Sequence, residues 1–140
     1  MKAWIVVAVL ISVASAQAPT PVDATFERLA KVGTFVFGLT GEAGVISQGE
    51  KDYKLILSRH TAEADFERLF SVGNPQAKSY ALVGIRSINR NRFRVLSSSL
   101  RDSKEDVTTE SGCIVYHETT GVVLKRIEAG DYATFPHDLP

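Results

Sequence analysis

The chain has 140 residues, and its 16 Lys and Arg balance 16 Asp and Glu, so its formal net charge at pH 7 is zero. A chain without net charge lacks the field that gathers nucleic acid or anionic lipid, which argues against both as general ligands. It holds one cysteine, Cys113, so an intrachain disulfide is excluded and the fold must depend on its apolar core.

The first 16 residues have the pattern of a cleavable secretory signal. Lys2 supplies a positive start, residues 3–13 carry no charge, and residues 14–16 (Ala-Ser-Ala) form a small-residue cleavage site. The apolar run spans about 11 residues, whereas a membrane span needs about 20. We therefore expect a secreted or periplasmic protein with no membrane span after cleavage. The expected organisation is a signal peptide at 1–16, a loose leader at 17–22, a single helical domain at 23–130 and a C-terminal tail at 131–140.

Five or six short helices are predicted, each from a capping residue followed by apolar residues at helical spacing. They cover residues 24–32, 48–58, 62–72 and 75–88, a segment after residue 89 and a last segment that ends near residue 130. The predicted N-caps are Asp23, Ser47, Thr61, Asn74, Asn89 and Thr119 or Thr120. Ser47 and Glu50 also fit a capping box, in which each side chain accepts a hydrogen bond from the other residue's amide.

The segment 75–88 has the clearest helical pattern. Its apolar and small residues recur every three or four positions: Ala77, Tyr80, Ala81, Gly84, Ile85 and Ile88. Since only two to four residues join the central helices, neighbouring helices are expected to pack antiparallel. The predicted fold class is therefore mainly α, with short antiparallel helical hairpins in a HEAT-like layout. It includes an irregular glycine-rich segment and leaves room for one short strand near Cys113.

Three glycines, Gly38, Gly41 and Gly44, recur every third residue before the helix at 48. This density is unfavourable in a helix, so the segment is predicted to be an irregular loop whose glycines pack closely against helices. No Lys-Ser/Thr pair follows them, so the phosphate-binding loop pattern is absent. The sequence favours a structural role for these glycines over an anion site.

Residues 103–109 are predicted to form a polar turn, and residues 112–116 a short strand or a buried extended segment. Cys113 and His117 are four residues apart, which on a strand separates them by about 13 Å, at roughly 3.3 Å per residue. This distance argues against a Cys/His nucleophile. We expect Cys113 to be a small buried residue, with pairing to another chain's thiol as the alternative.

Four motifs follow one another along the chain: Phe-Gly-x-x-Gly-x-Ala-Gly at 37–44, Ser-x-Gly-Glu at 47–50, Tyr-Ala-Leu-x-Gly-Ile at 80–85 and Ser-Gly-Cys at 111–113. In this order the chain resembles small exported bacterial proteins of unknown function. The resemblance covers most of the chain after the signal. It implies the same mostly helical fold and assigns no activity or functional residue.

One local basic cluster contains Arg86, Arg90, Arg92 and Arg94, with Arg101 and Lys104 nearby. Arg86, Arg90 and Arg94 are the candidate binding residues, for an acidic protein or an anionic envelope polymer. The alternative is a solvated basic edge. Only Phe93 lies among these arginines, so the stacking residues of a nucleic-acid site are missing.

No metal site or cofactor is expected, because the histidines His60, His117 and His137 are scattered without a second ligand nearby. The expected function is therefore non-enzymatic binding of a protein or a cell-envelope component. A first alternative is a cell-envelope hydrolase using Cys113 or acids near the glycine segment, such as Glu42 and Glu50. A second is a structural or accessory subunit without a ligand of its own.

Overall fold

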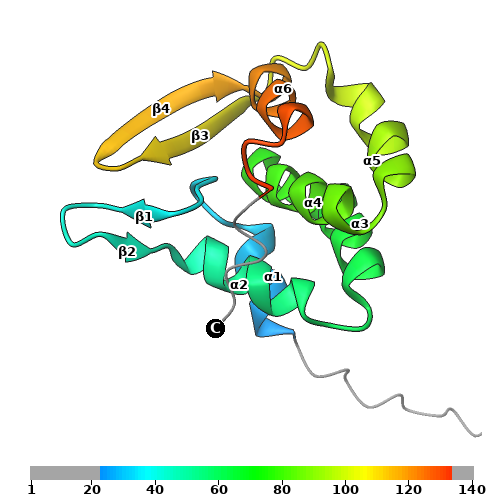
Figure 1. Cartoon of the computed structure of the whole chain (residues 1–140), viewed down its shortest axis with the longest axis horizontal. Helices are drawn as coiled ribbons and strands as arrows, with labels where there is room; N and C mark the ends of the chain where they lie inside the picture. The colour runs from blue at the N-terminus through cyan, green and yellow to red at the C-terminus, as the bar shows by residue number, and fades with distance from the viewer. Residues whose placement is uncertain (1–22, 134–140) are drawn as a thin grey trace, which may run out of the picture.

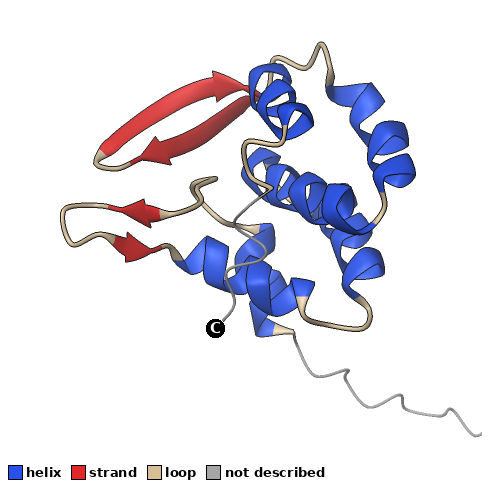
Figure 2. Cartoon of the chain, in the orientation of Figure 1, coloured by secondary structure: helices blue, strands red, loops and turns tan. Residues whose placement is uncertain are grey.

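The computed structural model describes residues 23–133, so the predicted signal peptide, the leader and residues 134–140 lie outside the described residues. The expected mainly helical class is confirmed, with two small two-stranded antiparallel sheets added to it (Figure 2). The two hairpins project side by side from one side of the helical body (Figure 1). The elements are α1 Ala24–Ala30, β1 Leu39–Thr40, β2 Val45–Ile46, α2 Gln48–Leu57, α3 Ala62–Val72, α4 Pro75–Ile88, α5 Arg90–Ser97, the 3₁₀ turn η1 Ser98–Leu100, β3 Asp106–Ser111, β4 Ile114–Thr119 and α6 Thr120–Ala129.

Capping residues fix most helix starts as the sequence predicts. The side chains of Asp23, Asn74 and Asn89 accept hydrogen bonds from the amides three residues on, at 3.1, 2.9 and 3.0 Å. Thr61 precedes α3 but forms no such bond, because its hydroxyl donates to Asp65 Oδ2 at 2.9 Å. Helix α1 ends at Ala30, two residues before the predicted end.

Helix α4 runs through the centre of the core. Five of the six residues of its predicted stripe are buried, and Ile88 at the helix end is exposed. Helix α3 packs closely along α4 because Gly84 has no side chain: a Cβ there would lie 2.4 Å from the Phe66 ring. A small residue of α4 thus admits the neighbouring helix.

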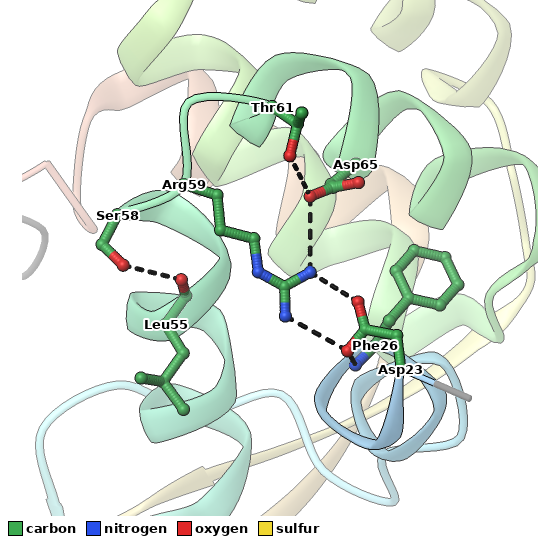
Figure 3. A network of polar contacts seen from close by, with 7 residues as sticks. All are labelled: Asp23, Phe26, Leu55, Ser58, Arg59, Thr61 and Asp65. Carbon is green, nitrogen blue, oxygen red and sulfur yellow. Dashed lines mark hydrogen bonds and ion pairs between the residues drawn. The ribbon is translucent and has the colours of Figure 1, made fainter. Parts of the chain in front are cut away.

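A polar network ties the start of α1 to the connection between α2 and α3 (Figure 3). The Arg59 guanidinium donates to both carboxylate oxygens of Asp23, at 2.6 and 3.1 Å, and to Asp65 Oδ2 at 3.4 Å. Asp23 also caps α1 through the Phe26 amide, so one carboxylate joins two parts of the chain 36 residues apart. The hydrogen bond from Arg59 is the main reason that the pKa of Asp23 lies below its usual value.

The region around Cys113 differs from the prediction, because it contains two six-residue strands rather than one short strand. Strand β3 pairs antiparallel with β4, from Asp106 opposite Thr119 to Ser111 opposite Ile114. The polar turn predicted at 103–109 is therefore wrong from residue 106 onward. Polar residues occupy this strand because only Val107 and Thr109 face the interior, and the remaining side chains are partly or fully exposed.

The glycine segment is also more regular than predicted, since β1 and β2 form a short hairpin around residues 41–44. Gly41 and Gly44 do not pack against helices: a Cβ on Gly41 would meet no atom within 4 Å, and one on Gly44 would meet only the Leu39 side chain, at 4.0 Å. Gly38, Gly41 and Gly44 instead have φ angles of 88°, 69° and 58°, which side-chain-bearing residues rarely adopt. Backbone conformation, not close packing, therefore explains these three glycines.

Among the described helices, none has the length and apolar character needed to cross a bilayer.

Candidate functional site

The predicted basic residues gather in one surface groove, which we call the arginine groove. Arg86 comes from the last turn of α4, Arg90 and Arg94 from α5, and Arg101 from the turn that follows η1. The other two lining residues are Phe93 and Glu128. Four guanidinium groups therefore face a single carboxylate, which makes the groove a basic surface on a chain without net charge.

Three of the four arginines are already engaged. Arg101 pairs with Glu128 at 3.3 Å, Arg94 Nη2 donates to Asn91 Oδ1 at 2.9 Å, and Arg86 Nη2 makes a long 3.4 Å bond to the backbone oxygen of Glu128. Arg90 makes no hydrogen bond or ion pair to the residues that the structure describes. Arg90 is thus the arginine of the groove whose whole guanidinium is available to a ligand.

Arg92 belongs to the sequence cluster but not to the groove. It reaches α3, where Nη2 donates to Glu67 Oε2 at 3.1 Å. This contact is the first cause of the lowered pKa of Glu67 and of the raised pKa of Arg92. The residues chosen from the sequence, Arg86, Arg90 and Arg94, are thus brought together, and Arg92 is separated from them.

A small hollow of about 130 Å³, with polar as well as apolar walls, adjoins the arginine groove. Arg86 and Arg90 line both, and the other walls are Val83, Ser87, Ile127, Tyr132 and Ala133. No pattern in the sequence indicates this hollow, because its walls come from two segments that are distant in the chain, residues 83–90 and 127–133. The helical spacing of Val83 and Arg90 gives no sign that Tyr132 returns to meet them.

A second cleft, which we call the hairpin cleft, lies between the β3–β4 hairpin and residues 35–37, which lead into the β1–β2 hairpin. The Gly41 amide donates to the Gly112 carbonyl at 2.9 Å, and the Phe35 amide donates to the Thr108 carbonyl at 2.8 Å. Between these two contacts opens a cavity of about 410 Å³. Its walls are Phe35, Val36, Phe37, Thr109, Glu110, Ser111, Tyr116, Glu118, Arg126 and Tyr132.

The polar groups of this hairpin cleft largely satisfy one another. Glu118 accepts from the Thr109 hydroxyl at 2.7 Å and pairs with Arg126. Arg126 Nε is a buried donor without a hydrogen-bond partner among the described residues. Since Glu110 and Glu118 outnumber Arg126, the cleft does not favour an anion.

Cys113 lies at the exposed tip of the β3–β4 hairpin, so the prediction of a buried thiol is wrong. A two-residue turn formed by Gly112 and Cys113 places the thiol in solvent, with Gly112 at a φ of 59°. His117 Nδ1 lies 2.9 Å from Asp106 Oδ2, across the hairpin, and no hydrogen bond joins it to Cys113 within the described part of the chain.

Glu50 and Glu42, the two acids named as candidates for a hydrolase, differ in their exposure to solvent. Glu50 is 1% exposed, and its carboxylate accepts from the Gly38 amide at 2.7 Å and pairs with Lys54 at 2.9 Å. Only half of the predicted capping box therefore forms, because the Ser47 hydroxyl accepts from the Glu50 amide while the glutamate turns to Gly38. Glu42 is exposed in the turn between β1 and β2. Glu50 thus anchors the glycine segment.

Over residues 23–133, no three His, Cys, Asp or Glu side chains are grouped so that they could hold a metal ion. Comparison of the chain with protein families, with curated proteins and with solved structures returned no match. The resemblance to small exported bacterial proteins therefore stays a prediction. The class that fold and site define is a small, mainly helical domain with a basic groove on its surface.

Proposed function

We propose that this chain is a small exported domain that binds an acidic protein or an anionic envelope component without chemical conversion, using the arginine groove. The observation that carries the proposal is that four arginines line one groove. Among the described residues, Arg90 has no hydrogen-bond or ion-pair partner. Arginine forms paired hydrogen bonds with carboxylate and phosphate groups, so such a groove suits an anionic ligand. The signal pattern of residues 1–16 supports the secreted or periplasmic location.

The helical layout supports the proposal in a further way. Residues 73 and 74 alone connect α3 to α4, and a single residue, Asn89, joins α4 to α5. Successive helices joined so tightly form a stiff surface that presents its side chains at fixed positions. A HEAT-like arrangement, in which such helical pairs provide a binding face, remains part of the proposal.

Charge reversal tests the groove. The variant Arg86→Glu/Arg90→Glu/Arg94→Glu is compared with Lys31→Glu/Lys51→Glu/Lys125→Glu, which makes the same charge change at exposed positions elsewhere. Because Arg86 contacts the end of α6, the double variant Arg90→Glu/Arg94→Glu is included, and circular dichroism verifies folding.

Binding is measured by biolayer interferometry to immobilised poly-L-glutamate and to an envelope protein fraction. We expect binding that weakens with salt, is lost in both groove variants and survives in the lysine variant. Equal binding by all folded variants would contradict the proposal.

A further inference from the structure

Strand β4 has a free edge. In an antiparallel pair, residues that lie opposite each other turn their amide and carbonyl groups either toward each other or both away from the pair, in alternation. The Thr108 carbonyl points away from β4, because it accepts from the Phe35 amide at 2.8 Å. His117 lies opposite Thr108 and therefore turns its own amide and carbonyl outward from the hairpin. Val115, two residues earlier on the same strand, does the same.

The outer edge of β3 is covered, whereas that of β4 is open. Parallel bridges from Phe35 and Thr40 cover β3. Within the described part of the chain, no backbone hydrogen bond outside the β3–β4 pair involves Val115 or His117. Edge strands are commonly protected by lysine, proline or a bulge, and residues 114–116 (Ile-Val-Tyr) contain none of these. The edge is therefore a template on which another strand can pair.

The side chains along this edge are apolar and exposed. Ile114, Val115 and Tyr116 are 57%, 55% and 44% exposed. Successive side chains of a strand point to opposite faces, so both faces of the edge offer apolar surface. A strand that pairs here gains main-chain hydrogen bonds and removes apolar surface from water on both faces. The segment that suits this edge is thus an extended one with successive apolar side chains.

Strand β4 of a second copy is such a segment, and its sequence selects one symmetric register. Two copies pair antiparallel about a twofold axis when outward-turned residues face outward-turned residues. An axis at Val115 sets Val115 against its own copy and Ile114 against Tyr116. An axis at Tyr116 sets Ile114 against Glu118, and an axis at His117 sets two imidazoles against each other. The first register alone matches apolar side chains with apolar side chains over residues 114–116.

The charges of the molecule also favour a second copy over a charged partner. The chain has no formal net charge, so two copies do not repel each other. Beside residues 114–116, the Glu118 carboxylate pairs with Arg126, and the His117 ring contacts Asp106 at 2.9 Å. An acidic or basic segment on this edge therefore finds no free counter-charge, whereas the uncharged strand of a second copy needs none.

We infer that two copies of this chain associate edge to edge through β4, in an antiparallel pair centred on Val115. The β3–β4 hairpins of the two copies then form one four-stranded sheet. Strand β4 and helix α5 lie on opposite sides of the helical body (Figure 1), so the dimer leaves the arginine groove of each copy open. Since each copy contributes a single strand edge, the interface is small, and we expect a reversible dimer.

Sedimentation velocity tests the association. The protein is purified from the secreted or periplasmic fraction of an expressing host, with Cys113 kept reduced, and measured from low micromolar to near-millimolar concentration. We expect a monomer–dimer equilibrium, unchanged in Cys113→Ser. Val115→Lys and Val115→Glu should each raise the dissociation constant by about tenfold or more, which corresponds to about 1.4 kcal/mol, because like charges meet on the axis. An equimolar mixture of these two variants should restore the dimer.

Val72 provides the matched controls. It is 62% exposed on α3, and Val72→Lys and Val72→Glu make the same changes away from β4. Both should dimerise like the unchanged protein. Because the outward amide of Val115 takes no part in the β3–β4 pair, the Val115 variants should fold, and circular dichroism verifies this.

Cysteine cross-linking locates the axis. In the Cys113→Ser background, a single cysteine replaces Val115, Tyr116 or His117. A residue on the axis faces its own copy at a Cα separation of about 4.5–5.5 Å, which lies within the range of disulfides. Val115→Cys should therefore give a disulfide-linked dimer fastest under mild oxidation. Val72→Cys in the same background gives the rate of random collision.

Each alternative result overturns the inference. A protein that stays monomeric over the whole range has no such interface. A dimer that tolerates both charges at Val115 associates through another surface, and a dimer that is lost on reduction is held by Cys113. Fastest cross-linking at Tyr116 or His117 rejects the register centred on Val115. None of these results changes the test of the arginine groove, which measures binding of an anionic ligand.

Discussion

The Tyr80 hydroxyl binds both polar groups of the Val36 backbone. It accepts a hydrogen bond from the Val36 amide at 3.1 Å and donates one to the Val36 carbonyl at 2.7 Å. All three groups are buried, so water does not compete for them. Together with Glu50, which holds the Gly38 amide, Tyr80 fixes the segment that leads into the β1–β2 hairpin and forms one wall of the hairpin cleft.

Tyr80→Phe should therefore destabilise the fold by about 2–3 kcal/mol, because it leaves a buried amide and a buried carbonyl unpaired. Tyr53→Phe is the matched control: Tyr53 is equally buried, but its hydroxyl lies near Ser87 without forming a hydrogen bond of regular geometry to any described residue. That change should cost less than about 0.5 kcal/mol or stabilise the protein slightly. Urea unfolding of the two variants measures the difference. Equal losses in both would show that the hydroxyl of Tyr80 is not an anchor.

Alkaline pH should weaken the fold through the same tyrosine. Burial, as the main cause, raises the pKa of Tyr80 from 10.0 to about 12, and burial also raises the pKa of Tyr53. In the unfolded chain the tyrosines ionise near pH 10, while the folded protein keeps them protonated. The stability that this preference provides is full below pH 10 and is lost as the pH rises toward 12, at about 1.4 kcal/mol per pH unit for each tyrosine.

Urea midpoints at pH 8, 10 and 11 test this dependence. Tyr80→Phe should show a shallower loss than the unchanged protein, because one of the shifted groups is missing. A midpoint that stays constant from pH 9 to pH 11 would contradict the proposed burial of both hydroxyls.

Local signals in the sequence were sufficient to locate the helices. Asn74 and Asn89 cap α4 and α5 through contacts only three residues long, so a short window of sequence contains the whole interaction. The buried face of α4 is also predictable from nearby residues, because side chains three or four positions apart lie on the same face of a helix. The exceptions are Thr61 and Thr119, which precede α3 and α6 without a capping hydrogen bond from the side chain; the Thr61 hydroxyl donates to Asp65 instead.

The β3–β4 hairpin escaped prediction because its strands lack a conventional apolar face. All four residues from Ile114 to His117 are exposed, so hydrophobicity does not alternate along β4. Thr109 occupies an inward position that an apolar residue would have revealed. One usable signal was present: Gly112 and Cys113 stand between runs with β-branched residues, and a glycine first in a two-residue turn is typical of hairpins.

The site was predictable only in part. Arg90 and Arg94 are four residues apart within α5, which places them on one face, whereas Arg86 belongs to α4 and joins them only through the angle of the junction at Asn89. Arg101 and Glu128 line the same groove but come from distant segments of the chain. Tyr132, which lines the adjoining hollow, is also distant in sequence from Arg86 and Arg90. No periodicity joins these residues, because tertiary packing alone brings α6 against the end of α4.

Gly84→Ala should destabilise the protein by about 1–3 kcal/mol through overpacking. The added methyl group would lie 2.4 to 2.7 Å from three atoms of the Phe66 ring, which is itself fully buried. Gly33→Ala is the control, because nothing lies within 4 Å of its added methyl group. Thermal unfolding should separate the two variants by several degrees. Similar melting temperatures would mean that α3 can shift away from α4 at little cost.

Acid should loosen the junction of α1 with the α2–α3 connection. The pKa of Asp23 is lowered chiefly by the Arg59 hydrogen bond, so its stabilising contribution is present above its ordinary pKa of 3.8 and is lost as the pH falls through the lower folded value. Asp23→Asn keeps the helix cap but removes the charge, and should cost less than about 1 kcal/mol at pH 7, since the pair is partly exposed. Asp23→Ala also removes the cap, at about 1 kcal/mol more.

The measurement is the free energy of unfolding from pH 7 to pH 2.5. The unchanged protein should lose more stability below pH 4 than Asp23→Asn, so that the two curves converge in acid. Asp102→Asn, which removes an exposed carboxylate, should follow the unchanged protein throughout. If Asp23→Asn instead runs parallel to the unchanged protein down to pH 2.5, the charge of Asp23 adds nothing through Arg59. The network in Figure 3 would then act only through the neutral hydrogen bond that caps α1.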